Sequence, residues 1–101
     1  MQSIRRGTTP TIHFTTTVEQ TDVSSLYITF MQGNDIILER NETEITWDET
    51  GLYVVLTQDE TLKFTPGLAN VQIRAKMVST LATATQILPL MVETVLKGGV
   101  I

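Results

Sequence analysis

Residues Leu68–Val78 read LANVQIRAKMV, and from Asn70 to Met77 their side chains alternate between polar and apolar. The apolar positions are Val71, Ile73, Ala75 and Met77, and the polar ones are Asn70, Gln72, Arg74 and Lys76. A period of two is the signature of a β-strand with one buried face and one solvated face. This segment is therefore predicted to be a central strand whose apolar face is covered by the other segments.

The composition predicts one domain that spans residues 1–101. A chain of 101 residues can bury a substantial core without metal or disulfide staples. It contains no cysteine, so no disulfide is possible, which fits a cytoplasmic or particle-bound protein better than a small secreted scaffold. The formal net charge of −4 argues against nucleic-acid binding, because that affinity comes largely from Lys and Arg contacts with phosphates.

Neither a signal peptide nor a membrane span is expected. The start, MQSIRRGTTP, has two arginines but no apolar run behind them. The longest apolar run, Ile87–Val92, is far shorter than the roughly 20 residues of a membrane helix. It also contains Pro89 and is predicted to be part of a strand.

Further strands are predicted in short segments separated by turn residues. These are Ser3–Arg6 with Thr11–Val18 (one strand broken at Gly7–Pro10), Ser25–Met31, Ile36–Arg40, Thr43–Trp47, Leu52–Leu56 and Ala84–Leu96. Pro10 cannot donate to a strand ladder, which places the first strand at an edge or at a switch between sheets. Thr57 and Glu60 form a capping-box motif that opens a short helix between the fifth and sixth strands. About seven short strands favour a two-layer antiparallel β-sandwich.

The turn between the second and third strands allows a register to be predicted. If Gly33-Asn34-Asp35 is a three-residue loop, Phe30 lies opposite Leu38 and Ile36 joins the same inward face. A two-residue loop would bring Glu39 to the core side, and burying an unpaired carboxylate is costly. The three-residue loop is therefore predicted.

The residues offer no recognisable active site. His13 is the only histidine, it points outward from the first strand, and no cysteine or second histidine can join it in a metal site. We expect it to be exposed to solvent or to lie in an interface. The sequence has no G-x-S-x-G, glycine-rich phosphate-loop or H-E-x-x-H motif. We therefore expect a protein that is not an enzyme and uses no cofactor or metal.

Two features of the middle of the chain could still serve a ligand. The carboxylates Glu39, Glu42, Glu44, Asp48 and Glu49 cluster there, but their spacing lacks the regular acidic positions of a calcium loop. They are predicted to form a solvated acidic rim. Trp47 is predicted to be an aromatic anchor in or beside the core, and its alternative role is to stack against a ligand.

Two strands are apolar on both faces. The last carries Ile87, Met91 and Val95 on one face and Leu88, Leu90 and Val92 on the other. Since a sandwich covers only one face of each sheet, two explanations remain. The surplus residues lie under loops or the helix or are single exposed apolar side chains, or an outer face meets a neighbouring subunit. In the second case the candidate interface residues are Tyr53, Val55, Ile87, Met91 and Val95.

The order of the motifs resembles that of a known group of proteins. The segments are IRRGTTPTIHF, LYITFMQGNDIILER, LTQDETLKFTPG, VQIRAKM and ETVLKGGVI, and together they cover nearly the whole chain. This order is similar to that of small Ig-like structural proteins encoded in prophages of Gram-positive bacteria. It is also similar to the N-terminal domain of upper baseplate proteins of lactococcal-type phages.

The resemblance implies an Ig-like antiparallel β-sandwich that docks with other phage structural proteins in a tail or baseplate. It implies no catalytic residues. No receptor-binding or shaft region follows as in the long baseplate proteins, so an assembly module is expected rather than direct host recognition. Such a protein would assemble in the bacterial cytoplasm and then reside in the virion, and it could also form homo-oligomers.

Two functions are therefore carried forward from the sequence. The first is a non-enzymatic phage or prophage structural protein that acts through protein–protein assembly. The second is a β-sandwich module that binds a glycan or small ligand through Trp47, Tyr53 and the acidic rim. Neither function involves nucleic acid or a membrane.

Overall fold

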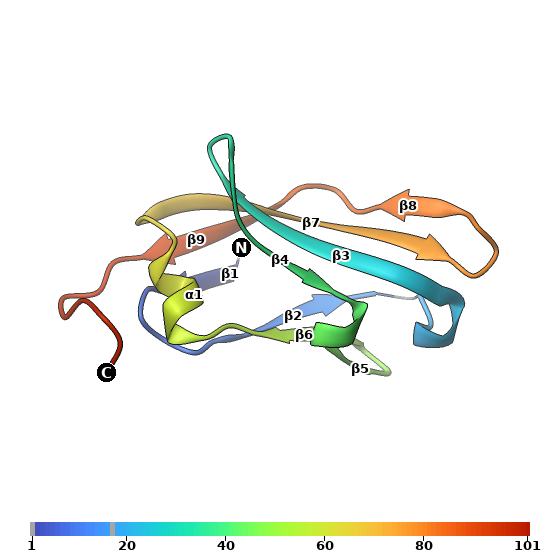
Figure 1. Cartoon of the computed structure of the whole chain (residues 1–101), viewed down its shortest axis with the longest axis horizontal. Helices are drawn as coiled ribbons and strands as arrows, with labels where there is room; N and C mark the ends of the chain where they lie inside the picture. Colours follow the sequence, from blue (N-terminus) through green and yellow to red (C-terminus); the bar gives the residue numbers. More distant parts are fainter. Residues whose placement is uncertain (1, 17) are drawn as a thin grey trace.

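The computed structural model describes residues 2–16 and 18–101 and consists of two β-sheets packed face to face (Figure 1). Its strands are β1 (Gln2–Arg5), β2 (Thr11–Thr15), β3 (Val23–Gln32), β4 (Asp35–Asn41), β5 (Thr46–Asp48), β6 (Gly51–Val55), β7 (Gly67–Met77), β8 (Ala82–Ala84) and β9 (Leu88–Glu93). Its helical segments are the 3-10 turns η1 (Gln20–Asp22) and η2 (Glu42–Glu44) and the helix α1 (Gln58–Leu62). Within these residues no helix has the length and apolar character needed to cross a membrane.

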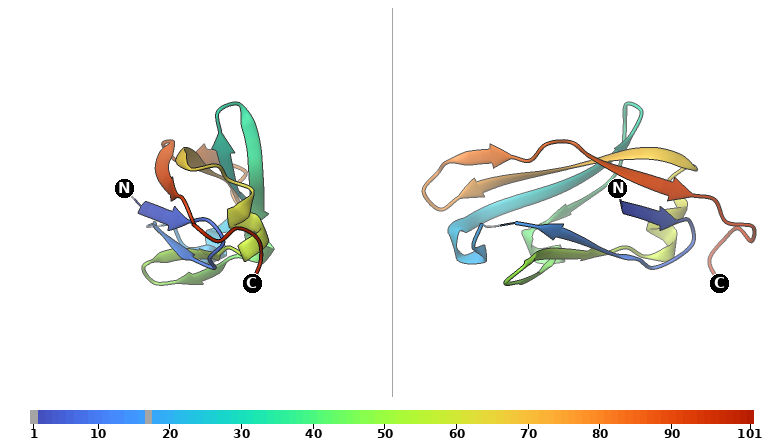
Figure 2. Two further views of the ribbon diagram at one scale, coloured as in Figure 1. Left: turned by 90° about the vertical axis from the view of Figure 1, so that its left-hand side faces the viewer. Right: turned by 180° about the vertical axis from the view of Figure 1, so that it is seen from behind.

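The larger sheet has the strand order β1-β9-β7-β3-β4, and the smaller sheet has the order β2-β6-β5. β8 pairs with β7 on the same side as β9 but further along, as the rear view in Figure 2 shows. The predicted central strand is β7, which lies between β3 and the β8–β9 segment. An all-β sandwich with one short helix, as predicted, is confirmed.

The centre of the core is the pair formed by β3 and β7. Ile28 lies directly opposite Ile73, and Phe30 directly opposite Val71, with all four side chains buried. The smaller sheet covers this face with the buried side chains Ile12, Phe14, Leu52 and Val54. The alternation predicted for β7 is therefore observed, and β3 and β6 show the same pattern.

The chain moves from one sheet to the other at Gly7–Pro10, so of the two placements predicted from Pro10, an edge or a switch between sheets, the structure shows the switch. β1 pairs in parallel with β9 in the larger sheet, whereas β2 pairs with β6 in the smaller one. The crossing is fixed by Thr61, a buried residue of α1. Its hydroxyl accepts a hydrogen bond from Gly7 N–H (3.0 Å) and donates one to the Thr8 carbonyl (2.9 Å). Thr17, which falls in the predicted first strand, lies outside the described residues.

The short helix α1 closes one end of the core. Its capping box is confirmed, because the Thr57 hydroxyl accepts from Glu60 N–H (3.2 Å) and the Glu60 carboxylate accepts from Thr57 N–H (2.8 Å). Phe64 follows the helix, is fully buried and packs edge-on against Phe30. Arg40 of β4 forms an ion pair with Glu60, which ties the helix to the larger sheet.

The ion pair with Arg40 also affects the pKa of Glu60. Burial of the carboxyl acts to raise its pKa, but the hydrogen bonds from the Arg40 side chain and the Thr57 N–H outweigh burial. The pKa of Glu60 is therefore held below its usual value, and the carboxylate stays ionised at neutral pH.

The β3–β4 hairpin differs from its prediction. Phe30 lies opposite Leu38 as predicted, but the turn contains only Gly33-Asn34, with Gln32 opposite Asp35. A β-bulge next to Phe30 shifts the register and makes both observations compatible. The predicted three-residue loop was wrong because counting residues along the sequence cannot distinguish a longer loop from a bulge.

The bulge changes which isoleucine faces the core. Ile36, predicted to point inward, lies opposite Met31 and is 61% exposed. Ile37, which the three-residue loop would turn outward, is half-buried and packs against the core. The hairpin therefore presents an apolar side chain on the outer face of the larger sheet.

The predicted fourth strand, Thr43–Trp47, is shorter in the structure. Glu42–Glu44 forms the 3-10 turn η2, and only Thr46–Asp48 is extended. The Asn41 side chain accepts from Thr43 N–H (2.9 Å), while the Glu44 carboxylate accepts from Asn41 N–H (3.1 Å). This capping box was legible in the sequence as N-x-x-E and was missed.

The predicted last strand, Ala84–Leu96, is interrupted between β8 and β9. Arg74 lies opposite Ala84 and Val71 opposite Leu88, so three steps along β7 correspond to four along its partner. The one extra residue is a β-bulge. The two short strands are therefore one bulged strand that pairs with β7 along its length.

The bulge determines which face of the last strand is buried. Thr85 anchors it, because its N–H donates to the Ile73 carbonyl (2.9 Å) and its hydroxyl accepts from Ile73 N–H (3.1 Å). Beyond the bulge the alternation is inverted. Leu90 and Val92 become buried, and Ile87 remains 63% exposed.

A test of the sheet packing follows from Gly51. This residue has φ of +147°, and a Cβ added there would lie 2.1 Å from the Phe14 carbonyl oxygen. We expect Gly51→Ala to lower the free energy of unfolding by about 3 kcal/mol or more, because β2 and β6 would have to separate. Urea unfolding at equilibrium measures the loss.

Gly33→Ala is the matched control. Gly33 also has a positive φ (+58°), but nothing lies within 4 Å of an added Cβ. Only the left-handed backbone penalty of about 1–2 kcal/mol is expected there. Equal losses for the two variants would contradict the close approach of Phe14 to Gly51.

Candidate functional site

A hydrogen-bonded polar cluster lies on the outer face of the smaller sheet. His13 of β2 lies opposite Tyr53 of β6, and the two rings stack with centroids 4.5 Å apart. Asp48, the last residue of β5, and Thr50, in the turn between β5 and β6, complete the cluster. Sequence reasoning missed it because the pairing of β2 with β6 is a property of the fold, not of neighbouring residues.

Asp48 is the electrostatic centre of this cluster. One carboxylate oxygen accepts hydrogen bonds from the Thr50 hydroxyl (2.6 Å) and Thr50 N–H (2.8 Å), and the other accepts from the Tyr53 hydroxyl (2.7 Å). These donors, the Thr50 hydroxyl first, lower the pKa of Asp48 from 3.8 to about 2. The turn is thus held by a permanently ionised acceptor at neutral pH.

The arrangement superficially resembles a nucleophile with its base, because the Thr50 Oγ1 lies 3.2 Å from the His13 Nε2. A hydroxyl has a single proton, however, and that of Thr50 is directed to Asp48. That proton is therefore not shared with Nε2 of His13, which would have to accept it in order to act as a base. The cluster braces the β5–β6 turn against β2 and does not activate a nucleophile.

The five candidate interface residues do not form one surface. Tyr53 and Val55 lie on the smaller sheet, and Tyr53 is already engaged in the His13 cluster. Met91 of β9 and the bulge residue Ile87 belong to the larger sheet. Val95 is half-buried beyond β9, close to Gly7.

The outer face of the larger sheet carries an apolar surface that includes one of these candidate residues. We call it the outer patch, and it consists of Met31, Ile36, Leu68 and Met91. Met31 lies opposite Ile36, and Leu68 lies opposite Met91 on the neighbouring strand pair. Of the candidate residues only Met91 belongs to it. Leu68 shares the parity of Asn70 and Gln72, so its outward position could have been read from the sequence.

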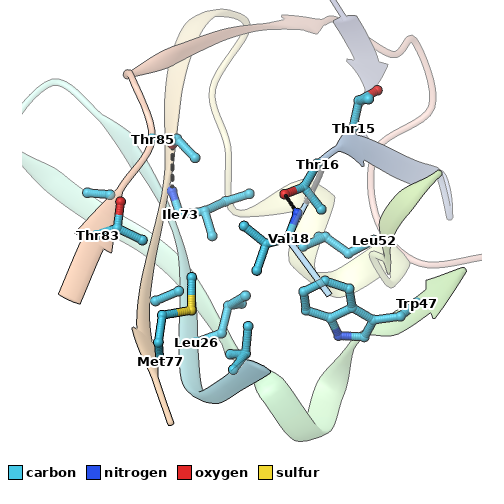
Figure 3. Close-up of a pocket in the computed structure, with 13 residues that line it drawn as sticks. Thr15, Thr16, Val18, Leu26, Trp47, Leu52, Ile73, Met77, Thr83 and Thr85 are labelled. Carbon is cyan, nitrogen blue, oxygen red and sulfur yellow. Dashed lines mark hydrogen bonds between the residues drawn. The ribbon is translucent and has the colours of Figure 1, made fainter. Parts of the chain in front are cut away.

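An apolar groove opens between the sheets at the end of the sandwich where β8 and β2 part (Figure 3). Val18, Leu26 and Trp47 point toward its centre, and it holds about 150 Å³. Pockets for small molecules usually hold roughly 300–1,000 Å³, so this groove has room for one or two side chains. Trp47 is half-buried and packs against the core, as the anchor interpretation predicts.

A more polar hollow continues from the groove. It shares Thr16, Val18 and Trp47 with the groove and is further lined by Glu19, Gln20, Thr21, Asp48 and Glu49. Of the five carboxylates in the middle of the sequence, only the last two reach it. Across residues 2–16 and 18–101, no three His, Cys, Asp or Glu side chains are grouped so as to hold a metal ion.

The comparisons with known proteins identify the class of fold. No protein-family model and no curated protein matches the chain. Among solved structures it is similar to fibronectin(III)-like modules of Clostridium thermocellum CbhA, with a TM-score of 0.50 and 18% identity over 95% of this chain and 89% of that one. The strand orders β9-β7-β3-β4 and β2-β6-β5 match the two sheets of an Ig-type sandwich. The chain is therefore an all-β, Ig-like sandwich of fibronectin(III)-like form.

The hydrogen bonds of Asp48 predict an acid-dependent turn. Because its folded pKa lies below its ordinary value, the carboxylate stabilises the fold fully above about pH 4 and loses this effect as pH falls toward about 2. The difference in unfolding free energy between the natural chain and Asp48→Asn should shrink across that window. Thr50→Val should raise the pKa of Asp48, as measured by NMR of the carboxyl carbon. A natural Asp48 that titrates at its ordinary value would contradict the arrangement.

Proposed function

We propose that this chain is a non-enzymatic structural component of a phage or prophage particle, in its tail or baseplate, and that it acts through protein–protein assembly. The order of its sequence motifs supports a place in a phage particle, because this order resembles that of Ig-like phage proteins. The outer patch supports assembly as the mode of action. The protein would be made in the bacterial cytoplasm and incorporated into the virion.

The outer patch is the observation that carries this proposal. The solvent face of an antiparallel sheet is normally polar, yet Ile36 is 61% and Leu68 is 52% exposed. They adjoin Met31 and Met91, which are half-buried, and methionine adapts readily to the shape of a partner. An apolar area on an outer sheet face is the expected mark of an interaction surface.

The geometry favours assembly over the ligand-binding alternative. Trp47 does not stand out from the surface as a stacking platform but lines a groove of about 150 Å³. Tyr53 is covered on one face by His13 and donates its hydroxyl to Asp48. Trp47 is therefore directed into the sandwich, and Tyr53 has only one ring face left for stacking against a sugar.

Particles from an induced lysogen that encodes this chain provide the test. After gradient centrifugation, the chain should sediment with the tail proteins at a fixed ratio, as measured by quantitative mass spectrometry. Leu68→Glu should abolish this incorporation, because it places a charge in the outer patch. Tyr27→Glu is the matched control, since Tyr27 is 48% exposed and faces outward from β3 in the same sheet.

Both variants should keep the urea-unfolding midpoint of the natural chain within the error of measurement. A chain that remains in the soluble fraction while intact particles sediment would overturn the proposal. Equal incorporation of the two variants would show that the outer patch is not the docking surface.

A further inference from the structure

We propose that two copies of this chain pair through strand β8 and so join their larger sheets into one continuous sheet. The interaction surface is the free edge of β8, and its occupant is the same edge of a second copy. This inference goes beyond the proposed function, because it rests on the edge of the sheet and not on the outer patch or on a phage protein.

The outer edge of β8 has no partner among the described residues. β8 pairs with β7 on one side, and β1, which covers the edge of β9, pairs only with Leu90–Glu93. Figures 1 and 2 show β8 at the border of the molecule, with no other segment beyond it. Every side chain of residues 79–87 is exposed. A further strand can therefore approach this edge without displacing any part of the chain.

The backbone groups of Ala82 and Ala84 point toward this free edge. Thr85 N–H donates to the Ile73 carbonyl of β7 (2.9 Å), and the Leu81 carbonyl accepts from β7 at the other end of the strand (2.8 Å). Backbone groups alternate in direction along a strand, so those of Ala82 and Ala84 turn away from β7. Their two N–H and two C=O groups are available to an added strand.

β8 lacks the features that protect the other sheet edges. Charged residues lie in β1, β4 and β5, and in β2 the His13 carbonyl accepts a hydrogen bond from the Gln2 side chain (2.9 Å). No charged residue lies between Lys76 and Glu93, and Leu81–Ile87, LATATQI, contains neither proline nor glycine. Charge and proline discourage strand pairing at an edge, and an uncharged stretch rich in threonine favours it.

The free edge is complementary to itself, which names a second copy as its occupant. In an antiparallel pair, residues that exchange both hydrogen bonds lie opposite each other. If Ala82 of each copy lies opposite Ala84 of the other, all the outward groups are bonded. Thr83 then lies on the two-fold axis opposite its own counterpart, and cross-strand threonine pairs are favourable. In the same register Leu81, which is 67% exposed, lies opposite Thr85 of the second copy.

The nearest charges permit this pairing when salt is present. In β7, Lys76 lies opposite Ala82 and Arg74 lies opposite Ala84, so pairing places Arg74 of one copy in the same row as Lys76 of the other. Three strand spacings, about 14 Å, separate the two residues, which exceeds the Debye length of about 8 Å at physiological salt. Because each copy also carries a net charge of −4, the association should strengthen as salt is added.

Sedimentation velocity of the 101-residue chain tests the inference. We expect a monomer–dimer equilibrium without larger species, because a two-fold contact uses the β8 edge of both copies. The dimer should form more readily at about 0.5 M than at about 0.05 M NaCl. Ala84→Pro should weaken dimerisation by about tenfold or more, since it removes an outward N–H and keeps the hydrogen bonds to β7. Leu68→Glu, in the outer patch, should leave dimerisation unchanged.

Substitutions of Thr83 test the register itself. Thr83→Lys and Thr83→Glu should each weaken dimerisation, because two like charges would meet across the axis. A one-to-one mixture of the two variants should recover it, since Lys then lies opposite Glu. Thr11→Lys is the matched control, because Thr11 is likewise exposed and lies in β2, an edge strand of the smaller sheet. Circular dichroism establishes that all variants are folded.

The lack of cysteine in the natural chain allows an independent measurement. Thr83→Cys can form a disulfide only between copies. Opposed residues of a pair without hydrogen bonds lie about 4.5 Å apart between Cα atoms, within the range that a disulfide spans. Mild oxidation should therefore produce a covalent dimer, whereas Thr11→Cys should remain monomeric under the same conditions.

A chain that stays monomeric at every concentration and salt would overturn the inference, as would a mixture that does not recover association or a Thr11→Cys control that cross-links equally. The outcome is separable from that of the proposed function. A chain that is monomeric alone yet sediments with phage particles would refute the pairing of β8 and leave the structural role intact. A dimer that stays out of the particles would do the reverse.

Discussion

The pairing of β3 with β7 is the constraint on which the rest of the structure depends. These are the two longest strands, and they are in register from Val23 to Met31, interrupted by one shift between Val23 and Ser25. Their inward residues meet in apolar pairs, so a slip of one residue would turn Ile28 and Phe30 to solvent. In the larger sheet, β4 pairs with β3, β8 and β9 pair with β7, and β1 pairs with β9. The smaller sheet covers the apolar face that β3 and β7 form.

Two β-bulges then determine what the surface looks like. One turns Ile36 outward in β4, and the other inverts the alternation between β8 and β9 and leaves Ile87 exposed. At both bulges the extra residue lies on the partner strand, in β4 or between β8 and β9, and not on β3 or β7. The inward residues of β3 and β7 therefore stay buried. The core therefore tolerates the bulges, and their consequence is that Leu38, Leu90 and Val92 are buried while Ile36 and Met91 lie on the outer face.

Sequence reasoning succeeded where the evidence is local. Period-two alternation located β7, and the Thr57 motif located α1. Pro10 predicted an edge or a switch between sheets, and the structure shows the switch. It failed where the outcome depends on partners distant in sequence. The bulges, the stacking of His13 on Tyr53 and the joining of the groove to its acidic rim all require knowledge of which strands are neighbours.

Native-state amide hydrogen exchange, followed by NMR, tests the central role of the β3–β7 pair most directly. The amides of β3 and β7 that bond to each other should exchange only through global unfolding, with the largest protection free energies in the chain. Amides of β2, β5 and β8, which lie at sheet edges, should exchange earlier through local opening. If the amides of the smaller sheet remained protected from exchange while those of the β3–β7 pair exchanged, the rest of the structure could not depend on that pair.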